Sequence, residues 1–268
     1  MNGIKENKVG ILIPVRVSSK RFPNKAMYKS NFGLPIEFLI KNLSNNFIKK
    51  KNIVICTTLE KNENKLSNLV KKMGCKLFRG SKNDIIDRFY KANLIYKYDY
   101  LIEVDGDDIM TDVKFIKICL NNLIKNNLDF VYTTNLPIGM NCKVFNAKAL
   151  NLAQKIKLSK NNANGFMQFF YKNPLIKKKN ILFKKYNKYK IRLTLDYIED
   201  IRFFEIMILI FKIKNLKINL KNCINLIKNN KDLSNINFFR NNDYNANTKK
   251  MKPLFYKSKN TTKKIFIS

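Results

Sequence analysis

Short apolar runs alternate along this chain with longer segments in which apolar residues recur every three or four positions. Residues 9–15 (VGILIPV), 53–58 (IVICTT) and 100–104 (YLIEV) are apolar enough to be strands that are buried on both faces. Residues 66–73 (LSNLVKKM) place their apolar side chains on one face of a helix. This alternation predicts a three-layer α/β fold with a mostly parallel sheet and right-handed crossovers.

The same patterns predict the remaining elements. Pro35 suits the first turn of a helix, and Gly74 sits where a left-handed residue would end one. We expect residues 1–240 to form one α/β domain with a small accessory lobe, and the polar, basic residues 241–268 to form a loosely held tail. The further strands are expected at 75–78, 128–134, 143–145, 181–183 and 191–195, and the further helices at 85–96, 116–124 and 197–213.

The composition is strongly basic. The 268 residues include 53 Lys and Arg against 19 Asp and Glu, a net charge of +34. Most of this excess is Lys, spread along the whole chain together with Asn and Ile, and the codons of all three can be built from A and T alone. Codon drift and solvated faces therefore explain the charge better than a nucleic-acid-binding patch, which would be clustered. We expect no specific nucleic-acid partner.

Other features of the composition limit where the protein can be located in the cell and which kinds of site it can have. The chain has no His, and its five Cys form no CxxC pair, which argues against a structural zinc site or a disulfide framework and fits a reducing cytoplasm. The N-terminus does not resemble a signal peptide. The longest apolar stretch, near 203–211, is interrupted by Glu205 and is too short to span a bilayer. We therefore expect a cytoplasmic protein with no membrane contact.

Two loops carry candidate chemistry. In a parallel sheet the ligand lies beyond the carboxyl ends of the strands, so the loops after 15, 58, 78 and 104 should meet at one site. The first loop supplies Arg16, Ser19, Arg21 and Lys25, although it matches neither a Walker loop nor a GxGxxG fingerprint. Guanidinium, ammonium and hydroxyl groups together suit the binding of a polyphosphate. The alternative is a basic loop that is only solvated.

The loop after residue 104 is acidic. Asp105, Asp107 and Asp108 fall within four positions at the end of a strand, in a chain where acids are scarce. Carboxylates so placed suit Mg²⁺ that also contacts substrate phosphates, with an Asp-rich turn as the alternative. Asp196 follows the expected strand at 191–195 and could reach the same metal, whereas the neighbouring Glu199 and Asp200 could favour the start of a helix.

Five collinear blocks between residues 11 and 226 resemble the sugar-acid cytidylyltransferases, in particular the branch typified by spore-coat-polysaccharide proteins. The blocks are IPVRVSSKRFPNKAM (13–27), FRGSKNDIIDRFYKA (78–92), VDGDDIMTD (104–112), LPIGMNCKVFNAKAL (136–150) and IRLTLDYIEDIRFFEIM (191–207). The resemblance implies a nucleotide-diphosphosugar-transferase-like fold. It also implies a reaction in which CTP and a sugar acid or related sugar give a CMP-sugar and pyrophosphate, for surface polysaccharide or glycan synthesis.

The resemblance also implies roles for individual residues. The catalytic residues would be Arg16, Lys25 and Asp107, and Mg²⁺ would be bound by Asp107 and Asp196. A homodimer is implied as well. The residues implied to bind the nucleotide are Arg16, Ser19, Arg21 and Lys25 at the triphosphate, Thr57, Thr58, Gly80 and Ser81 at the cytosine, and Asp87 and Arg88 close by.

Departures from the family pattern keep alternatives open. Asn141 and Lys143 replace two acids of the pattern near the expected sugar, so the identity of the sugar is open and a drifted, inactive relative is one alternative. A glycosyltransferase could use Asp105-Gly106-Asp107 as a DxD motif. An RNA-binding protein could use the net charge, although we find no aromatic platform of the kind that stacks RNA bases.

Overall fold

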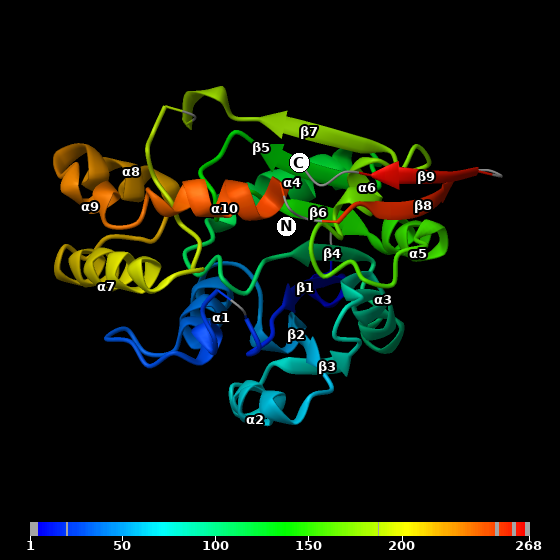
Figure 1. Ribbon diagram of the computed structural model, residues 1–268, viewed down its shortest axis with the longest axis horizontal. Helices are drawn as coiled ribbons and strands as arrows, with labels where there is room; N and C mark the ends of the chain where they lie inside the picture. The colour runs from blue at the N-terminus through cyan, green and yellow to red at the C-terminus, as the bar shows by residue number, and fades with distance from the viewer. Residues whose placement is uncertain (1–4, 20, 187, 250–251, 259–260, 266–268) are drawn as a thin grey trace.

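The computed structural model describes residues 5–19, 21–186, 188–249, 252–258 and 261–265. Its main sheet has the strand order β3-β2-β1-β4-β6-β5-β7, in which β6 is antiparallel to both of its neighbours and the other pairs are parallel (Figure 1). The predicted mostly parallel sheet is confirmed. The strands are β1 (Val9–Pro14), β2 (Ile53–Thr58), β3 (Lys76–Gly80), β4 (Tyr100–Glu103), β5 (Phe130–Thr134), β6 (Lys143–Asn146) and β7 (Lys178–Leu182).

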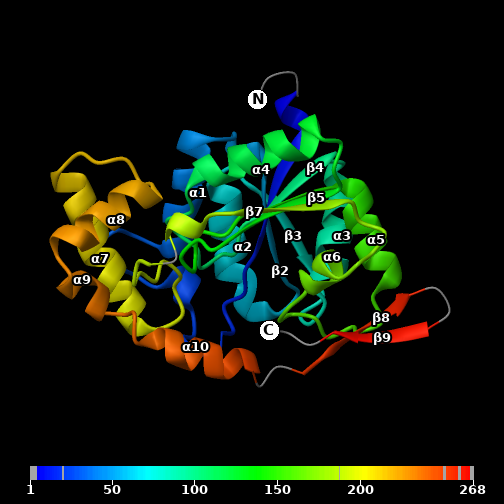
Figure 2. The same ribbon diagram turned by 90° about the horizontal axis from the view of Figure 1, so that it is seen from above.

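Helices cover both faces of this sheet, as Figure 2 shows. In β1, Ile11 and Ile13 point into one apolar core and Leu12 into the other, and all three are fully buried. Because each such side chain contributes about 1.5–3 kcal/mol on burial, a strand covered on both faces is apolar throughout. The first core is covered by α1 (Pro35–Asn46), α2 (Asn64–Lys72) and α4 (Val113–Lys125), and the second by α3 (Ile85–Tyr96), α5 (Ala147–Ile156) and α6 (Gln168–Tyr171).

The signals predicted at Pro35 and Gly74 are confirmed. Pro35 is the first residue of α1, and Gly74 follows α2 with a φ of 75°. Asp84 caps α3, because its side chain accepts a hydrogen bond from the backbone N–H of Asp87.

A group of helices at one side of the molecule forms the accessory lobe (Figure 2). It comprises α7 (Ile198–Ile213), α8 (Leu220–Asn229) and the short α9 (Asp232–Asn235). Phe203 and Phe204 of α7 are fully buried in the same core as α1 and α4, so the lobe is continuous with the domain. Among the described residues, no helix has the length and apolar character needed to cross a membrane.

Residues 191–195 do not form the expected strand. They make one isolated parallel bridge, between Ile138 and Arg192, and the N–H of Leu193 donates to the carbonyl of Ile138 (3.0 Å). A Cβ at Gly139 would lie 2.0 Å from the carbonyl oxygen of Leu193, so only glycine permits this approach. The alternating pattern of this segment therefore reflects burial against a loop rather than pairing within the sheet.

Residues 241–268 were expected to be a loosely held tail, but the part that is described is helical or paired in a hairpin. Helix α10 (Arg240–Lys249) is followed by β8 (Leu254–Ser258) and β9 (Thr261–Ile265), which pair antiparallel. Leu254, Tyr256 and Ile265 are at most 8% exposed and pack into the core beside α3 and α5. A few apolar side chains therefore anchor a segment whose composition is otherwise polar.

Candidate active site

The two predicted loops meet beyond the ends of β1 and β4. We call residues 16–19 and 21–25 the cationic loop, and residues 105–108 the acidic turn. A Cβ at Gly106 would lie 3.0 Å from the Cβ of Val15 and 3.2 Å from the carbonyl oxygen of Pro14. Glycine at this position therefore lets the acidic turn pass directly against the start of the cationic loop.

Lys25 joins the two loops. Its Nζ donates to Oδ2 of Asp107 at 2.5 Å and to Oδ1 of Asp196 at 2.9 Å. Burial alone would lower the pKa of Lys25, but the charges of Asp107 and Asp196 outweigh burial and raise this pKa above its ordinary value. The structure thus brings together three of the residues that the sequence placed at one site, including the distant Asp196.

Asp196 is held in place by a buried network. The Nη2 of Arg192 lies 3.1 Å from Asp196 Oδ2, and its Nε lies 2.9 Å from Asp200 Oδ1, with both Arg192 and Asp200 fully buried. Asp200 also accepts the backbone N–H of Asp196 (2.7 Å) and of Tyr197 (2.9 Å). Asp200 therefore positions the metal-site candidate, beyond the helix-start role that was one sequence interpretation. Arg192 was missed, and its signal was an Arg four residues before Asp196 in a chain rich in Lys.

The cationic loop is braced by Glu63, which the sequence analysis also missed. The carboxylate of this buried residue accepts the backbone N–H of Val17 (2.9 Å) and the hydroxyl of Thr57 (2.8 Å). The side chain of Thr57 thus points at Glu63. Arg21, further along the same loop, donates to Asp196 at 2.5 Å.

The end of β3 and the start of α3 supply four more predicted residues. The Oγ of Ser81 accepts the backbone N–H of Asp84 (3.1 Å), and Asp87 pairs with Lys91 at 2.9 Å. A Cβ at Gly80 would lie 3.1 Å from Cγ of Arg88, so the backbone packs closely on that side chain. Ser81 and Asp87 are therefore engaged within this corner of the fold.

Arg88 is a buried cation that forms no close ion pair with any described acid. It is 2% exposed; its Nη1 donates to the carbonyl of Cys56 (3.1 Å), and its Nε has no hydrogen-bond partner within the described residues. Burial lowers the pKa of Arg88 below its ordinary value; the nearby charge of Arg16 acts in the same direction, against the opposing charges of Glu63 and Asp84. Arg16 itself makes no ion pair with any described residue. Arg16 and Arg88 thus lie near each other beside the strand ends, each without a close ion-pair partner among the described residues, and an anion bound there would contact both.

The remaining predicted positions have simpler environments. Thr58 is buried, and its carbonyl accepts a hydrogen bond from Nε of Arg79 at 2.9 Å. Ser19 is partly exposed, and its backbone N–H donates to the carbonyl of Val17. No described contact joins either residue to the acidic turn.

Lys143, one of the departures from the family pattern, neutralises part of the acidic turn. Its Nζ lies 2.7 Å from Glu103 and 3.0 Å from Asp105, and Glu103 is its direct partner in the β4–β6 register. Burial and the charge of Asp105 raise the pKa of Glu103 to about 8, against the opposing charge of Lys143. Asp105 thus pairs with Lys143, whereas Asp107 pairs with Lys25.

Tyr244 brings helix α10 to the site, in the segment that was expected to be a tail. The centre of its ring lies 5.8 Å from Cζ of Arg21 and 5.7 Å from Cζ of Arg192. Burial, followed by the charges of Asp105 and Asp196, raises its pKa above the ordinary value for tyrosine. Tyr244 is therefore a site residue that its polar, basic surroundings in the sequence concealed.

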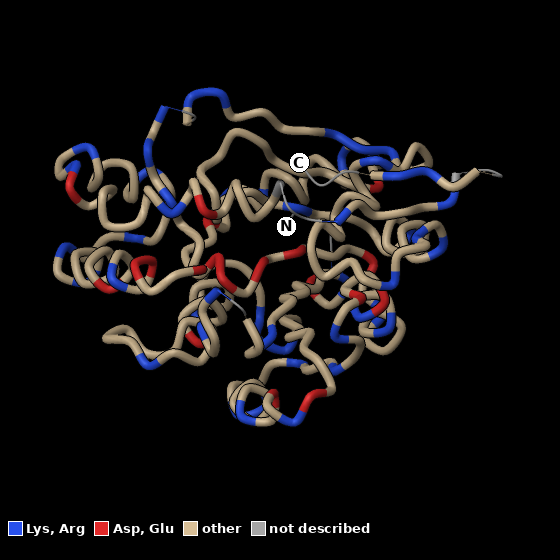
Figure 3. The backbone as a smooth tube through the Cα atoms, viewed as in Figure 1, with Lys and Arg blue, Asp and Glu red and all other residues tan. Residues whose placement is uncertain are grey.

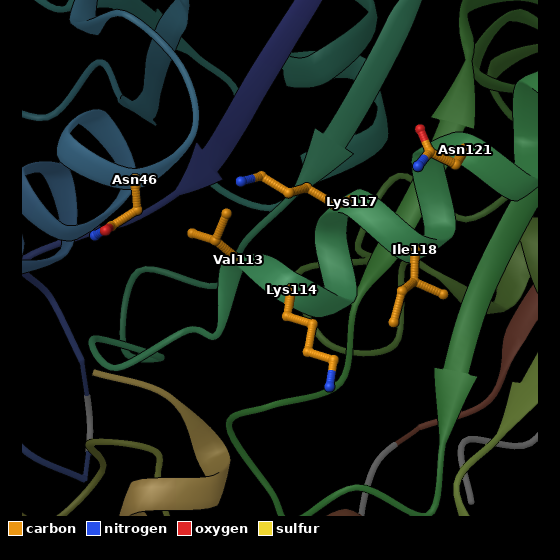
Figure 4. A pocket seen from close by; sticks show the side chains of 6 residues that line it. All are labelled: Asn46, Val113, Lys114, Lys117, Ile118 and Asn121. Atoms are coloured by element: carbon orange, nitrogen blue, oxygen red, sulfur yellow. The ribbon is translucent and has the colours of Figure 1, made fainter. Parts of the chain in front are cut away.

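A separate hollow of about 430 Å³ shares no residue with this site. It lies between the end of α1 and the start of α4 (Figure 4) and is lined by Asn46, Val113, Lys114, Lys117, Ile118 and Asn121. Within the described residues, no group of three or more His, Cys, Asp or Glu side chains is arranged to hold a metal ion. The site offers instead a pair of carboxylates, that of Asp107 in the acidic turn and that of Asp196, which both contact Lys25.

Comparison with known proteins identifies the family. The sequence model of the cytidylyltransferases matches residues 10–261. This chain belongs to the cytidylyltransferase family. The match covers the cationic loop, the acidic turn, Asp196 and helix α10, so it includes the whole site described above.

The chain is also similar to individual proteins and to solved structures. The chain is 32% identical to the protein MJ1063 of Methanocaldococcus jannaschii, over 84% of this chain and 93% of the relative. It is 24% identical to the spore coat polysaccharide biosynthesis protein SpsF of Bacillus subtilis, over 72% and 83%. A cytidylyltransferase structure from Leptospira borgpetersenii superposes with a TM-score of 0.75 at 26% identity, covering 84% of this chain and 96% of that one. The predicted family and its Rossmann-like fold are confirmed.

Proposed function

We propose that this cytidylyltransferase transfers CMP from CTP to a hydroxyl of a sugar or sugar acid and releases pyrophosphate, as a step toward surface polysaccharide or glycan. The observation that carries the proposal is the contact of Lys25, in the cationic loop, with Asp107 and Asp196. This contact supports the proposal because it brings a cation that we assign to phosphate next to paired carboxylates, the layout that a metal-bound triphosphate needs. The similarity to SpsF, whose name places it in spore coat polysaccharide synthesis, supports the sugar class of the acceptor.

The triphosphate is assigned to Arg16, Ser19, Arg21 and Lys25. Arg16 pairs with no described acid and Arg88 is a buried cation, so an incoming anion would satisfy charges that the protein leaves unpaired. Cytosine is assigned to the edge formed by Thr58, Gly80 and Ser81, with Asp87 and Arg88 close by. Thr57 supports this edge indirectly, because its hydroxyl is committed to Glu63.

Asp107 and Asp196 fit Mg²⁺ as a cofactor. Their oxygens converge on one cation, the ammonium of Lys25, which occupies the place between them. Two carboxylates with further ligands from water and phosphate are a usual set for this hard ion. Bound there, Mg²⁺ would supply charge neutralisation at the phosphate oxygens.

Catalysis then consists mainly of positioning and charge stabilisation. The acceptor oxygen forms a bond to the α-phosphorus while the bond from that phosphorus to the bridging oxygen of pyrophosphate breaks, and the acceptor proton passes to solvent. Arg16 and Lys25 neutralise the charge that develops on the leaving pyrophosphate. The buried Arg192–Asp200 pair keeps Asp196 in register with Asp107.

The decisive experiment is an assay of pyrophosphate release from CTP and Mg²⁺ against a panel of sugars and sugar acids. Arg16→Ala and Asp107→Asn should each lower turnover at least a hundredfold, equivalent to about 3 kcal/mol, with little change in melting temperature. Lys148→Met is the matched control, since it removes one charge from a Lys–Asp pair at the ends of the strands opposite to the site. Release with UTP or ATP in place of CTP would overturn the base assignment.

The glycosyltransferase alternative is weakened by the geometry of the acidic turn. A DxD motif needs both of its acids at one nucleotide-bound metal, but Asp105 pairs with Lys143 while Asp107 pairs with Lys25. The cytoplasmic location and the homodimer stay predictions, and all five cysteines being free thiols is compatible with a reducing compartment.

A further inference from the structure

The carboxylates assigned to the metal are already bound to a cation of the chain itself. For Asp107, Lys25 is the one ion-pair partner among the described residues. Asp196 is contacted by Lys25, by Arg21 at 2.5 Å and by Arg192 at 3.1 Å. Little of either carboxylate faces water, since their side chains are 23% and 2% exposed.

The charges of this cluster are balanced before any metal arrives. Arg192 is matched by Asp200, which leaves Lys25 and Arg21 to neutralise Asp107 and Asp196. A divalent cation that entered here would compete with the Lys25 ammonium for the same oxygens and would be repelled by it at short range. The arrangement therefore disfavours binding of the metal alone.

We propose that Lys25 is an exchange residue, whose ammonium holds the metal position between Asp107 and Asp196 closed and moves to the triphosphate when the nucleotide binds. This inference rests on the proposed function. The flexible four-carbon side chain of Lys25 lets its charge move without movement of the backbone. The Lys25 ammonium thus neutralises the carboxylates before the nucleotide binds and the phosphates afterwards. Metal and nucleotide therefore bind together.

Metal binding without nucleotide tests this proposal, with Mn²⁺ as the probe and electron paramagnetic resonance as the readout. Lys25→Met should bind Mn²⁺ at least tenfold more tightly than the wild type, because the competing ammonium is gone. Lys25→Arg keeps the cation and should bind Mn²⁺ within about threefold of the wild type. Lys148→Met also removes one lysine charge, but at the ends of the strands opposite to the site, and it should leave Mn²⁺ affinity unchanged.

The affinity for nucleotide should change in the opposite direction from the affinity for Mn²⁺. In EDTA, CTP should bind Lys25→Met at least tenfold more weakly than the wild type, since the cation that moves to the triphosphate is missing. A Lys25→Met protein whose Mn²⁺ affinity lies within twofold of the wild type would overturn the proposal, and so would an equal gain in Lys148→Met. If wild-type protein binds CTP but these Mn²⁺ results fail, the exchange role alone is wrong; absence of CTP binding to the wild type would overturn the proposed function itself.

The wild-type chain offers a second measurement, in case Lys25→Met does not fold. Lysine ammonium groups held in ion pairs give observable proton–nitrogen resonances, and that of Lys25 is the one missing from Lys25→Arg. Addition of CTP in EDTA should shift this resonance as the ammonium exchanges its partners. A resonance that does not move while CTP is bound would contradict the exchange.

Discussion

Glu103 is a carboxyl group buried completely beneath the acidic turn, with Lys143 as its ion-pair partner. Its pKa is raised from 4.5 to about 8, first by burial and then by Asp105. Between these two pH values the unfolded chain releases a proton that the folded chain keeps, so stability falls as the pH rises. The free energy of unfolding of the wild type, measured relative to Glu103→Gln, should fall by on the order of 2 kcal/mol from pH 5 to pH 8.

Urea unfolding at several pH values measures this difference. Glu37→Gln, on α1, provides the reference for loss of a carboxyl group outside the acidic turn. Parallel curves for the wild type and Glu103→Gln across this range would show that Glu103 is ionised in the folded chain, and would contradict the prediction.

Arg192 is another residue whose charge is fully buried. Arg192→Met should lower the free energy of unfolding by about 3–5 kcal/mol, because it leaves Asp200 buried without its cation. Arg240→Met is the matched comparison: Arg240 pairs with Glu199 but is 29% exposed, so its loss should cost at most about 1 kcal/mol. Similar costs for the two variants would mean that the Arg192 network contributes no special stability.

Within the C-terminal hairpin, the two faces of β8 have unequal roles. Leu254 is 2% exposed and packs into the core beside α3 and α5, whereas Phe255 is 41% exposed on the other face. Leu254→Ala should lower the free energy of unfolding by about 2–4 kcal/mol, and Phe255→Ala by less than about 1 kcal/mol. Chemical denaturation of both variants checks this. Equal, small effects would restore the original expectation of a loosely held tail.

The elements that the sequence predicted correctly are those whose local pattern and tertiary role agree. Strand β1 is apolar throughout because it is covered on both faces, and helix α1 has a helical period of apolar residues because one of its faces packs on the core. Residues 191–195 carry a strand pattern but pack against the loop at Ile138, a long-range contact that periodicity does not encode. Helix α10 lacks an apolar face, so polar contacts such as Arg240 with Glu199 secure it instead.

For the site, residues at strand ends were predictable and the residues that support them were not. Lys25 and Asp107 stand in loops that the topology brings together, so their contact followed from the order of the elements. Glu63 and Tyr244 reach the site from a short 3-10 helix and from the C-terminal helix. Neither position is marked by local sequence, because only the folded chain shows what a single polar side chain contacts.

Across the whole molecule, the positive charge is distributed rather than gathered. Figure 3 shows Lys and Arg along nearly every segment, whereas acidic residues collect near the middle of the view, where β4 ends. Several of the cations closest to the site, such as Lys25 and Lys143, are neutralised by this acidic turn. The surplus that gives the net charge of +34 is therefore spread along the chain rather than gathered in one segment, whereas a nucleic-acid-binding patch would be clustered.

This distribution of charge predicts how the protein binds RNA. Binding should be weak and blind to sequence, because scattered lysines contact phosphates and read no bases. Each released counterion steepens the salt dependence, so a contact with several phosphates should lose about a thousandfold in affinity between 50 and 200 mM salt. Fluorescence anisotropy with two unrelated single-stranded RNAs measures both properties, and adding CTP with Mg²⁺ tests whether the site is involved. Tight, sequence-selective binding at 150 mM salt would show that the charge serves a nucleic-acid partner after all, whereas the expected loss would assign it to composition.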